Sequence, residues 1–99
     1  MSTETEVYTL PPILDLRAAA PLKADLAARV GGPIDIDASK VERLGGLCLQ
    51  VLIASAAAWQ STARSWRISG VSEPFREDVR LMGADALLGL EPKPEIAPC

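Results

Sequence analysis

The stretch that decides the fold is DASKVERLGGLCLQVLI, residues 37–53. An apolar strand ends at Asp37, a short charged loop follows, and a Gly-Gly pair then opens a helix that is apolar around most of its circumference. Loops at the ends of strands often carry binding residues, because the scaffold beneath them holds their side chains in place. We therefore expect the chain to pack around this strand-loop-helix unit and to carry its function beside the loop.

The composition is typical of a small packed domain that neither binds nucleic acid nor inserts into a membrane. The chain has 99 residues, of which 48% are hydrophobic, and this fits one folded domain. Aromatic residues make up 4% and the formal charge is −3. A nucleic-acid partner is therefore not expected, because the chain has few aromatic residues for base stacking and no net positive charge to neutralise phosphates. The longest apolar run, residues 47–59, is shorter than the roughly 20 residues that span a bilayer, so direct membrane insertion is not expected.

The N-terminus and the cysteines point to the cytoplasm. Residues 1–6 are polar and acidic, unlike a signal peptide. Cys48 and Cys99 form no CxxC pair and no zinc spacing, which suits a reducing compartment. Cys48 lies within the apolar helix and is interpreted as a small buried hydrophobic residue.

Catalytic residues are not assembled in any familiar pattern. The chain has no histidine, which removes the commonest general base and the commonest metal ligand. Asp35 and Asp37 lie two apart on a strand and share a face, so metal binding or acid–base chemistry is considered for them. No third ligand stands nearby, and Asp37 is better placed to accept N–H bonds in the loop. We expect no enzyme activity, no cofactor, and no catalytic, cofactor-binding or metal site.

Hydrophobic periodicity and turn residues set out the elements. In chain order we expect strands at 6–10, 13–16, 33–37 and 66–70, and helices at 17–30, 46–63 and about 73–88. Pro11-Pro12 stops or bends the first strand, so that the first two strands form either a hairpin or one bent segment. Asp25 and Arg29 are expected to form an exposed i,i+4 ion pair. Ser72 is expected to cap the third helix, and Gly83 to weaken or stop it.

These elements predict an α/β fold with a mixed sheet of four to five strands and three main helices. A parallel crossover is the economical topology for a strand lying between two helices. We expect residues 1–6 to form a disordered leader, residues 7–88 the folded domain, and residues 89–99, which are rich in proline, a flexible tail.

Two stretches resemble the STAS (anti-sigma-factor-antagonist) domain family. One is residues 37–41 with the Gly-Gly pair and the apolar helix. The other is residues 68–72 with the helix segment 75–83. The resemblance covers roughly residues 7–88 and implies a small α/β module that binds protein partners, often kinases. The run 41–45 followed by 49–52 is similar to the small bacterial STAS proteins associated with chemotaxis histidine kinases.

The resemblance also locates a phosphorylation site that this chain lacks. Many STAS domains carry Asp-Ser-Ser/Thr-Gly at the start of the second helix, and a kinase phosphorylates the hydroxyl before the glycine. Counted without gaps, Leu47 takes the acceptor place; with Gly46 on the family's glycine, Gly45 takes it. Neither register supplies a hydroxyl, so no phosphorylation is expected there. Ser39 is the nearest hydroxyl and favours a structural turn; phosphorylation of Ser39 or Ser72 is the alternative.

The resulting hypothesis is a non-catalytic protein-binding module of a bacterial signalling system. It would bind a histidine kinase or related regulator without phosphorylation at the usual STAS serine position. The alternatives are a soluble STAS subunit of an ATP-driven lipid-transport complex and an anti-anti-sigma factor, and alanine-rich helix faces leave a homodimer open. The candidate partner-binding residues are Lys40, Glu42, Arg43, Gly45, Gly46, Leu47 and Cys48.

Overall fold

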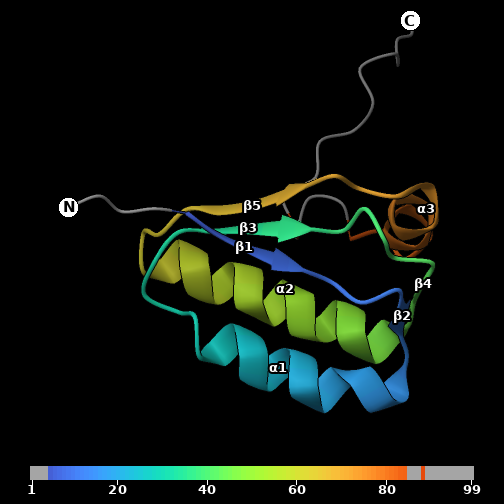
Figure 1. Ribbon diagram of the computed structural model, residues 1–99, viewed down its shortest axis with the longest axis horizontal. Helices are drawn as coiled ribbons and strands as arrows, with labels where there is room; N and C mark the ends of the chain where they lie inside the picture. The colour runs from blue at the N-terminus through green and yellow to red at the C-terminus, as the bar shows by residue number, and fades with distance from the viewer. Residues whose placement is uncertain (1–4, 85–87, 89–99) are drawn as a thin grey trace, which may run out of the picture.

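The computed structural model describes residues 5–84 and 88. Its elements are β1 (Glu6–Thr9), β2 (Ile13–Leu14), the 3-10 turn η1 (Leu16–Ala18), α1 (Ala19–Ala27), β3 (Ile34–Asp37), β4 (Arg43–Leu44), α2 (Gly46–Ser61), β5 (Trp66–Ser69) and α3 (Glu73–Leu81). Figure 1 shows α1 and α2 side by side on one face of the sheet, with α3 at one end. The predicted α/β fold with three helices is confirmed.

The five strands in the described part of the chain form a three-stranded sheet in the order β1-β3-β5 and a two-stranded sheet of β2 and β4. All three strand pairs are parallel, as the crossover topology predicts, so the strands form two parallel sheets where one mixed sheet of four to five strands was expected. In the centre of the larger sheet, Ile36 of β3 lies opposite Tyr8 of β1 and Ile68 of β5. The strand that ends at Asp37 is therefore the middle of the sheet.

The first two strands are one bent segment rather than a hairpin. β1 pairs with β3, whereas β2 pairs with β4, so the chain changes sheets between them. The bend falls at Pro11 and Pro12. The Pro12 carbonyl accepts hydrogen bonds from the backbone N–H groups of Glu42 at 2.7 Å and Arg43 at 3.2 Å. The bend is thus tied to the charged loop before α2.

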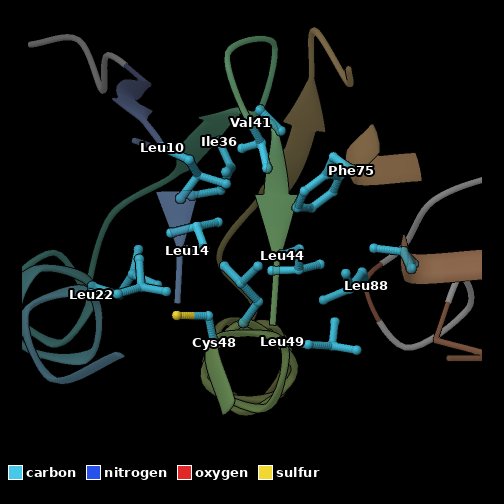
Figure 2. Close-up of a cluster of buried hydrophobic side chains, with 14 of the residues drawn as sticks. Leu10, Leu14, Leu22, Ile36, Val41, Leu44, Cys48, Leu49, Phe75 and Leu88 are labelled. Atoms are coloured by element: carbon cyan, nitrogen blue, oxygen red, sulfur yellow. The ribbon is translucent and has the colours of Figure 1, made fainter. Parts of the chain in front are cut away.

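The core forms where both sheets meet α1, α2 and α3. On β3, Ile34 and Ile36 are completely buried while Asp35 and Asp37 are half-buried, as strand alternation requires. Figure 2 shows side chains from β2, β3, β4, α2 and α3 converging on one cluster, with Leu14, Ile36, Leu44, Cys48 and Phe75 among them. The loop and the start of α2 are consequently built on the core.

The first helix differs from its prediction. Asp15 accepts hydrogen bonds from the N–H groups of Arg17 at 3.1 Å and Ala18 at 3.3 Å. This capping sets up the 3-10 turn, so that the regular helix α1 begins at Ala19 and ends at Ala27. The expected single helix over 17–30 is therefore divided at its start and shorter at its end.

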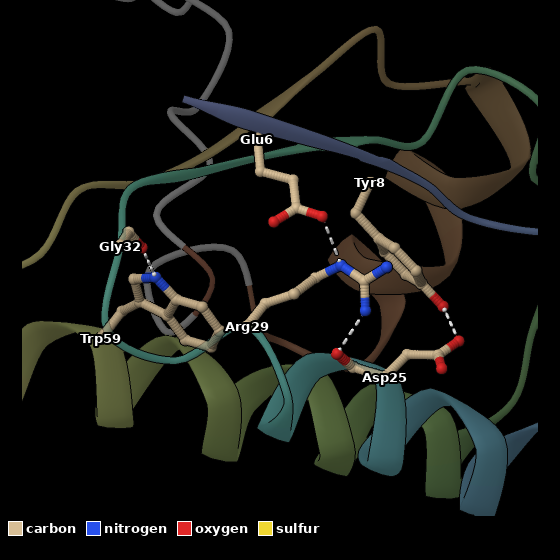
Figure 3. Close-up of polar contacts among 6 residues, drawn as sticks. All are labelled: Glu6, Tyr8, Asp25, Arg29, Gly32 and Trp59. Atoms are coloured by element: carbon tan, nitrogen blue, oxygen red, sulfur yellow. Dashed lines mark hydrogen bonds and ion pairs between the residues drawn. The ribbon is translucent and has the colours of Figure 1, made fainter. Parts of the chain in front are cut away.

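The expected Asp25–Arg29 ion pair is wrong. Arg29 forms its ion pair with Glu6 at 2.8 Å and donates to the backbone carbonyl of Asp25 at 2.6 Å. The Asp25 carboxylate instead accepts from the Tyr8 hydroxyl at 2.8 Å, and the guanidinium lies 4.9 Å from the Tyr8 ring centre. These contacts fasten α1 to the edge strand β1 (Figure 3).

The third helix begins and stops at the predicted signals. The Ser72 hydroxyl caps α3, and Gly83 has a φ of +67°, a left-handed conformation that ends helices. Because α3 ends at Leu81, a continuous helix to Leu88 is wrong. The predicted flexible tail, residues 89–99, and the first four residues of the predicted leader lie outside the described residues. Glu6, assigned to that leader, is the first residue of β1.

Candidate partner-binding site

Two glycines shape the beginning of α2. Gly45 is the N-cap residue, and its N–H donates to the Leu14 carbonyl at 2.9 Å. A Cβ at Gly45 would lie 3.3 Å from that same carbonyl oxygen, a close approach that favours glycine. Gly46 is exposed and has open space around it. No side chain among the described residues caps α2, so the N–H groups of its first turn lack that partner.

The loop before α2 holds its charged side chains on a fixed backbone. Lys40, Glu42 and Arg43 are all exposed. Besides the bonds from residues 42 and 43 to Pro12, the Leu44 N–H donates to the Asp78 carboxylate of α3 at 3.1 Å. The backbone is therefore anchored from two sides, while the three charged side chains face solvent.

Leu47 and Cys48 are adjacent in the chain but differ in their exposure to solvent. The Leu47 side chain is 46% exposed, whereas Cys48 is completely buried. The Cys48 thiol lies 3.3 Å from the carbonyl of Asp15, and burial, followed by the Asp15 charge, raises the pKa of the thiol. Cys48 is thus a core residue, as its interpretation as a buried hydrophobic residue predicts, and its side chain cannot contact a partner. The remaining candidates, which we call the α2 N-terminal surface, are Lys40, Glu42, Arg43, Gly45, Gly46 and Leu47.

The two aspartates of β3 are engaged in structural hydrogen bonds. Asp37 accepts from the Ser39 N–H at 3.0 Å, and this bond, with a further one from the Ser39 hydroxyl, holds the pKa of Asp37 below its ordinary value. Asp35 accepts from the Ser69 hydroxyl at 2.7 Å. Within the described residues no group of three or more metal-ligating side chains comes together. The geometry therefore gives Asp37 and Ser39 a structural role, in which their hydrogen bond stabilises the turn after β3.

Sequence reasoning missed a role for Gly70. Its φ is +60°, and a Cβ there would lie 2.8 Å from the Asp37 carboxylate and 3.3 Å from the Ser39 Cβ. The loops after β3 and β5 therefore touch, and Gly70 makes room for the turn that starts the candidate site. The signal was present, because loops that follow neighbouring parallel strands meet at one edge of a sheet.

Comparison with known protein families identifies this arrangement as a STAS domain. The chain belongs to the STAS_2 family, whose model is described as "Mlab, STAS domain" and matches residues 3–90. STAS domains are in general non-enzymatic binding modules. Comparisons with curated proteins and with solved structures gave no significant match. None of the helices in the described residues is long and apolar enough to cross a membrane.

Proposed function

We propose that this STAS domain is a non-catalytic protein-binding module of a bacterial signalling system. It binds a histidine kinase or a related regulator through the α2 N-terminal surface, without phosphorylation at the usual STAS serine position. The observation that supports this proposal most directly is the first turn of α2: it is exposed at Gly46 and Leu47, and residues 45–49 contain no hydroxyl.

The chemistry of this surface fits a partner that brings its own acceptor groups. The N–H groups at the start of a helix carry a partial positive charge, and anions are stabilised there. In a phosphorylated STAS domain a phosphate attached to the domain occupies this region. Here the exposed cations Lys40 and Arg43 lie in the loop that leads into the same turn, so a carboxylate or carbonyl of the partner takes the equivalent place. Leu47 then supplies an apolar contact beside these polar ones.

Tagged protein, used as bait in the source cell and analysed by mass spectrometry, tests the surface. Leu47→Asp places a charge in the centre of the contact and is expected to abolish partner capture. Val30→Asp is the matched control, because Val30 is 43% exposed against 46% for Leu47 and lies outside the α2 N-terminal surface. Circular dichroism should be unchanged in both variants. Capture that survives Leu47→Asp would show that the surface is assigned wrongly.

Phosphorylation is tested separately. The recovered kinase and ATP are incubated with the protein, and the intact mass is followed with time. We expect no added phosphate. A phosphate on Ser39, lost in Ser39→Ala, would mean that the switch has moved to the loop rather than disappeared.

A second candidate is the soluble STAS subunit of an ATP-driven lipid-transport complex. The observation that favours it is the family description, which names Mlab and no chemotaxis protein. Such a subunit would dock on the transport ATPase. The same capture experiment separates the readings: a histidine kinase supports the first, a transport ATPase the second, and an anti-sigma kinase the third alternative, an anti-anti-sigma factor.

A further inference from the structure

A groove of about 520 Å³ runs between α1 and α2. The residues that line it recur three or four positions apart on each helix, so that two helical stripes face each other. Figure 1 shows the two helices side by side and running in the same direction. Its volume falls within the roughly 300–1,000 Å³ of small-molecule sites in proteins.

The groove is open because the side chains along its walls are small, and the residues at its base are apolar. Ala27 of α1 and Ala54 and Ala58 of α2 form part of the walls, and the buried residues Leu26 and Trp59 lie among the lining. α2 has no charged residue along its 16 residues, although several of its positions face solvent. The groove is therefore an apolar surface that is exposed to water and extends down to buried core residues.

Few polar side chains line the groove. Among the described residues that line it, Lys23 is the charged one, and Gln50 and Ser55 are the uncharged polar ones. Within the part of the chain that the structure describes, Lys23 makes no hydrogen bond or ion pair. The nearby acid Asp25 is already bound to Tyr8. The ammonium group is thus available to a negatively charged ligand.

We infer that this groove binds a single-chain apolar monocarboxylate, with its carboxylate at Lys23 and its chain directed toward Val30 and Trp59. Along α2 the lining residues from Leu47 to Ala58 span about 17 Å, at a rise of about 1.5 Å per residue. That length suits a chain of medium length, such as decanoate. The apolar walls of the groove cover the hydrocarbon chain of the ligand, and the Lys23 ammonium group pairs with its carboxylate.

Other occupants fit the groove less well. A second copy of this chain would present the same lining, whose described residues include no acid, and would cover Lys23 without a counter-charge. A protein helix would meet a strip about 17 Å long and about 10 Å wide. That strip is far smaller than the roughly 800 Å² per partner of a stable protein interface.

Titration of the purified, nitrogen-15-labelled protein with decanoate below its micelle concentration tests the inference by NMR. We expect saturable shifts at the amides of Ala27, Ala54 and Ala58, with a Kd below about 1 mM. Ala54→Leu fills the groove and is expected to abolish these shifts. Ala57→Leu adds the same side chain at an exposed position of the same helix outside the groove, and should leave them intact.

The charge is tested with a neutral ligand of the same chain length. Lys23→Gln is expected to weaken decanoate binding about threefold to fivefold, as for an exposed ion pair, and to leave decanol binding unchanged. Lys40→Gln, which removes a lysine outside the groove, is the control. An equal loss for both ligands would overturn the role of Lys23.

Three results would overturn the site itself. They are the absence of saturable shifts, shifts centred outside the groove, and a groove that is closed by self-association, seen as concentration-dependent sedimentation that Ala54→Leu removes. The inference does not depend on the proposed partner, because it uses purified protein and a ligand rather than capture from cells. Failure of one therefore leaves the other standing.

Discussion

The Ser72 hydroxyl joins α3 to the loop of the candidate site through two hydrogen bonds. It accepts from the Phe75 N–H at 3.1 Å and donates to the carbonyl of Val41 at 2.6 Å. Ser72→Ala removes the helix cap, which contributes about 1 kcal/mol. It also leaves the carbonyl of the buried residue Val41 without this donor, at a cost of about 1 kcal/mol more. We expect the free energy of unfolding to fall by about 2 kcal/mol.

Urea denaturation followed by the fluorescence of Trp59 and Trp66 measures this change. The midpoint should fall while the slope stays constant, because the native surface is unchanged. Ser72→Thr keeps both bonds and should cost less than about 0.5 kcal/mol. Ser72→Asp keeps the cap but cannot donate to Val41, and its carboxylate would face that carbonyl oxygen, so it should lose at least half as much as Ser72→Ala. A loss below about 0.5 kcal/mol for Ser72→Ala would refute the assignment of the two bonds.

Three further changes follow from the described contacts. Burial, and then the hydrogen bond to a carboxylate, raises the pKa of Tyr8 from 10.0 to about 12. The fold therefore favours the neutral phenol. The neutral phenol contributes about 1 kcal/mol to the free energy of unfolding, after allowance for its partial exposure. This contribution is complete below pH 10 and is lost as the pH rises to about 12. Tyr8→Phe should flatten this part of the urea-midpoint profile against pH. Gly70→Ala should cost about 1–3 kcal/mol, because of its positive φ and the approach of Asp37, whereas Gly32→Ala, with open space, should be nearly neutral in the same assay. Trp59→Phe should lower the thermal midpoint through loss of a 2.8 Å indole hydrogen bond worth about 1 kcal/mol.

Features set by neighbours in the chain could be predicted from the sequence. The alternation of Ile34 to Asp37 gave the central strand, and Ser72 with Pro74 gave the start of α3, because each signal acts within one turn or strand. The ion pair of Arg29 could not be found in this way. Helical spacing pointed to Asp25, whereas the partner that the fold supplies, Glu6, lies on a strand 23 residues earlier in the chain.

The candidate site shows the same limit more sharply. On a helix with apolar residues on every side, periodicity does not indicate which side is buried. The sequence therefore places both Leu47 and Cys48 among the candidate partner-binding residues, although one is half-exposed and the other is completely buried. Packing of η1 and the two sheets against α2 decides between them, and this packing is visible only in three dimensions.

The two proposed sites meet at Leu47, which belongs to the α2 N-terminal surface and also lines the groove. Substitution of Leu47 alone consequently cannot separate them. Arg43→Glu changes a charge of the surface outside the groove, and Ala54→Leu changes the groove outside the surface. If the sites are independent, Arg43→Glu weakens partner capture without affecting decanoate, and Ala54→Leu does the reverse. If each variant instead changes both, Leu47 couples the sites, and occupation of the groove would by linkage alter partner affinity by the same factor as the partner alters ligand affinity.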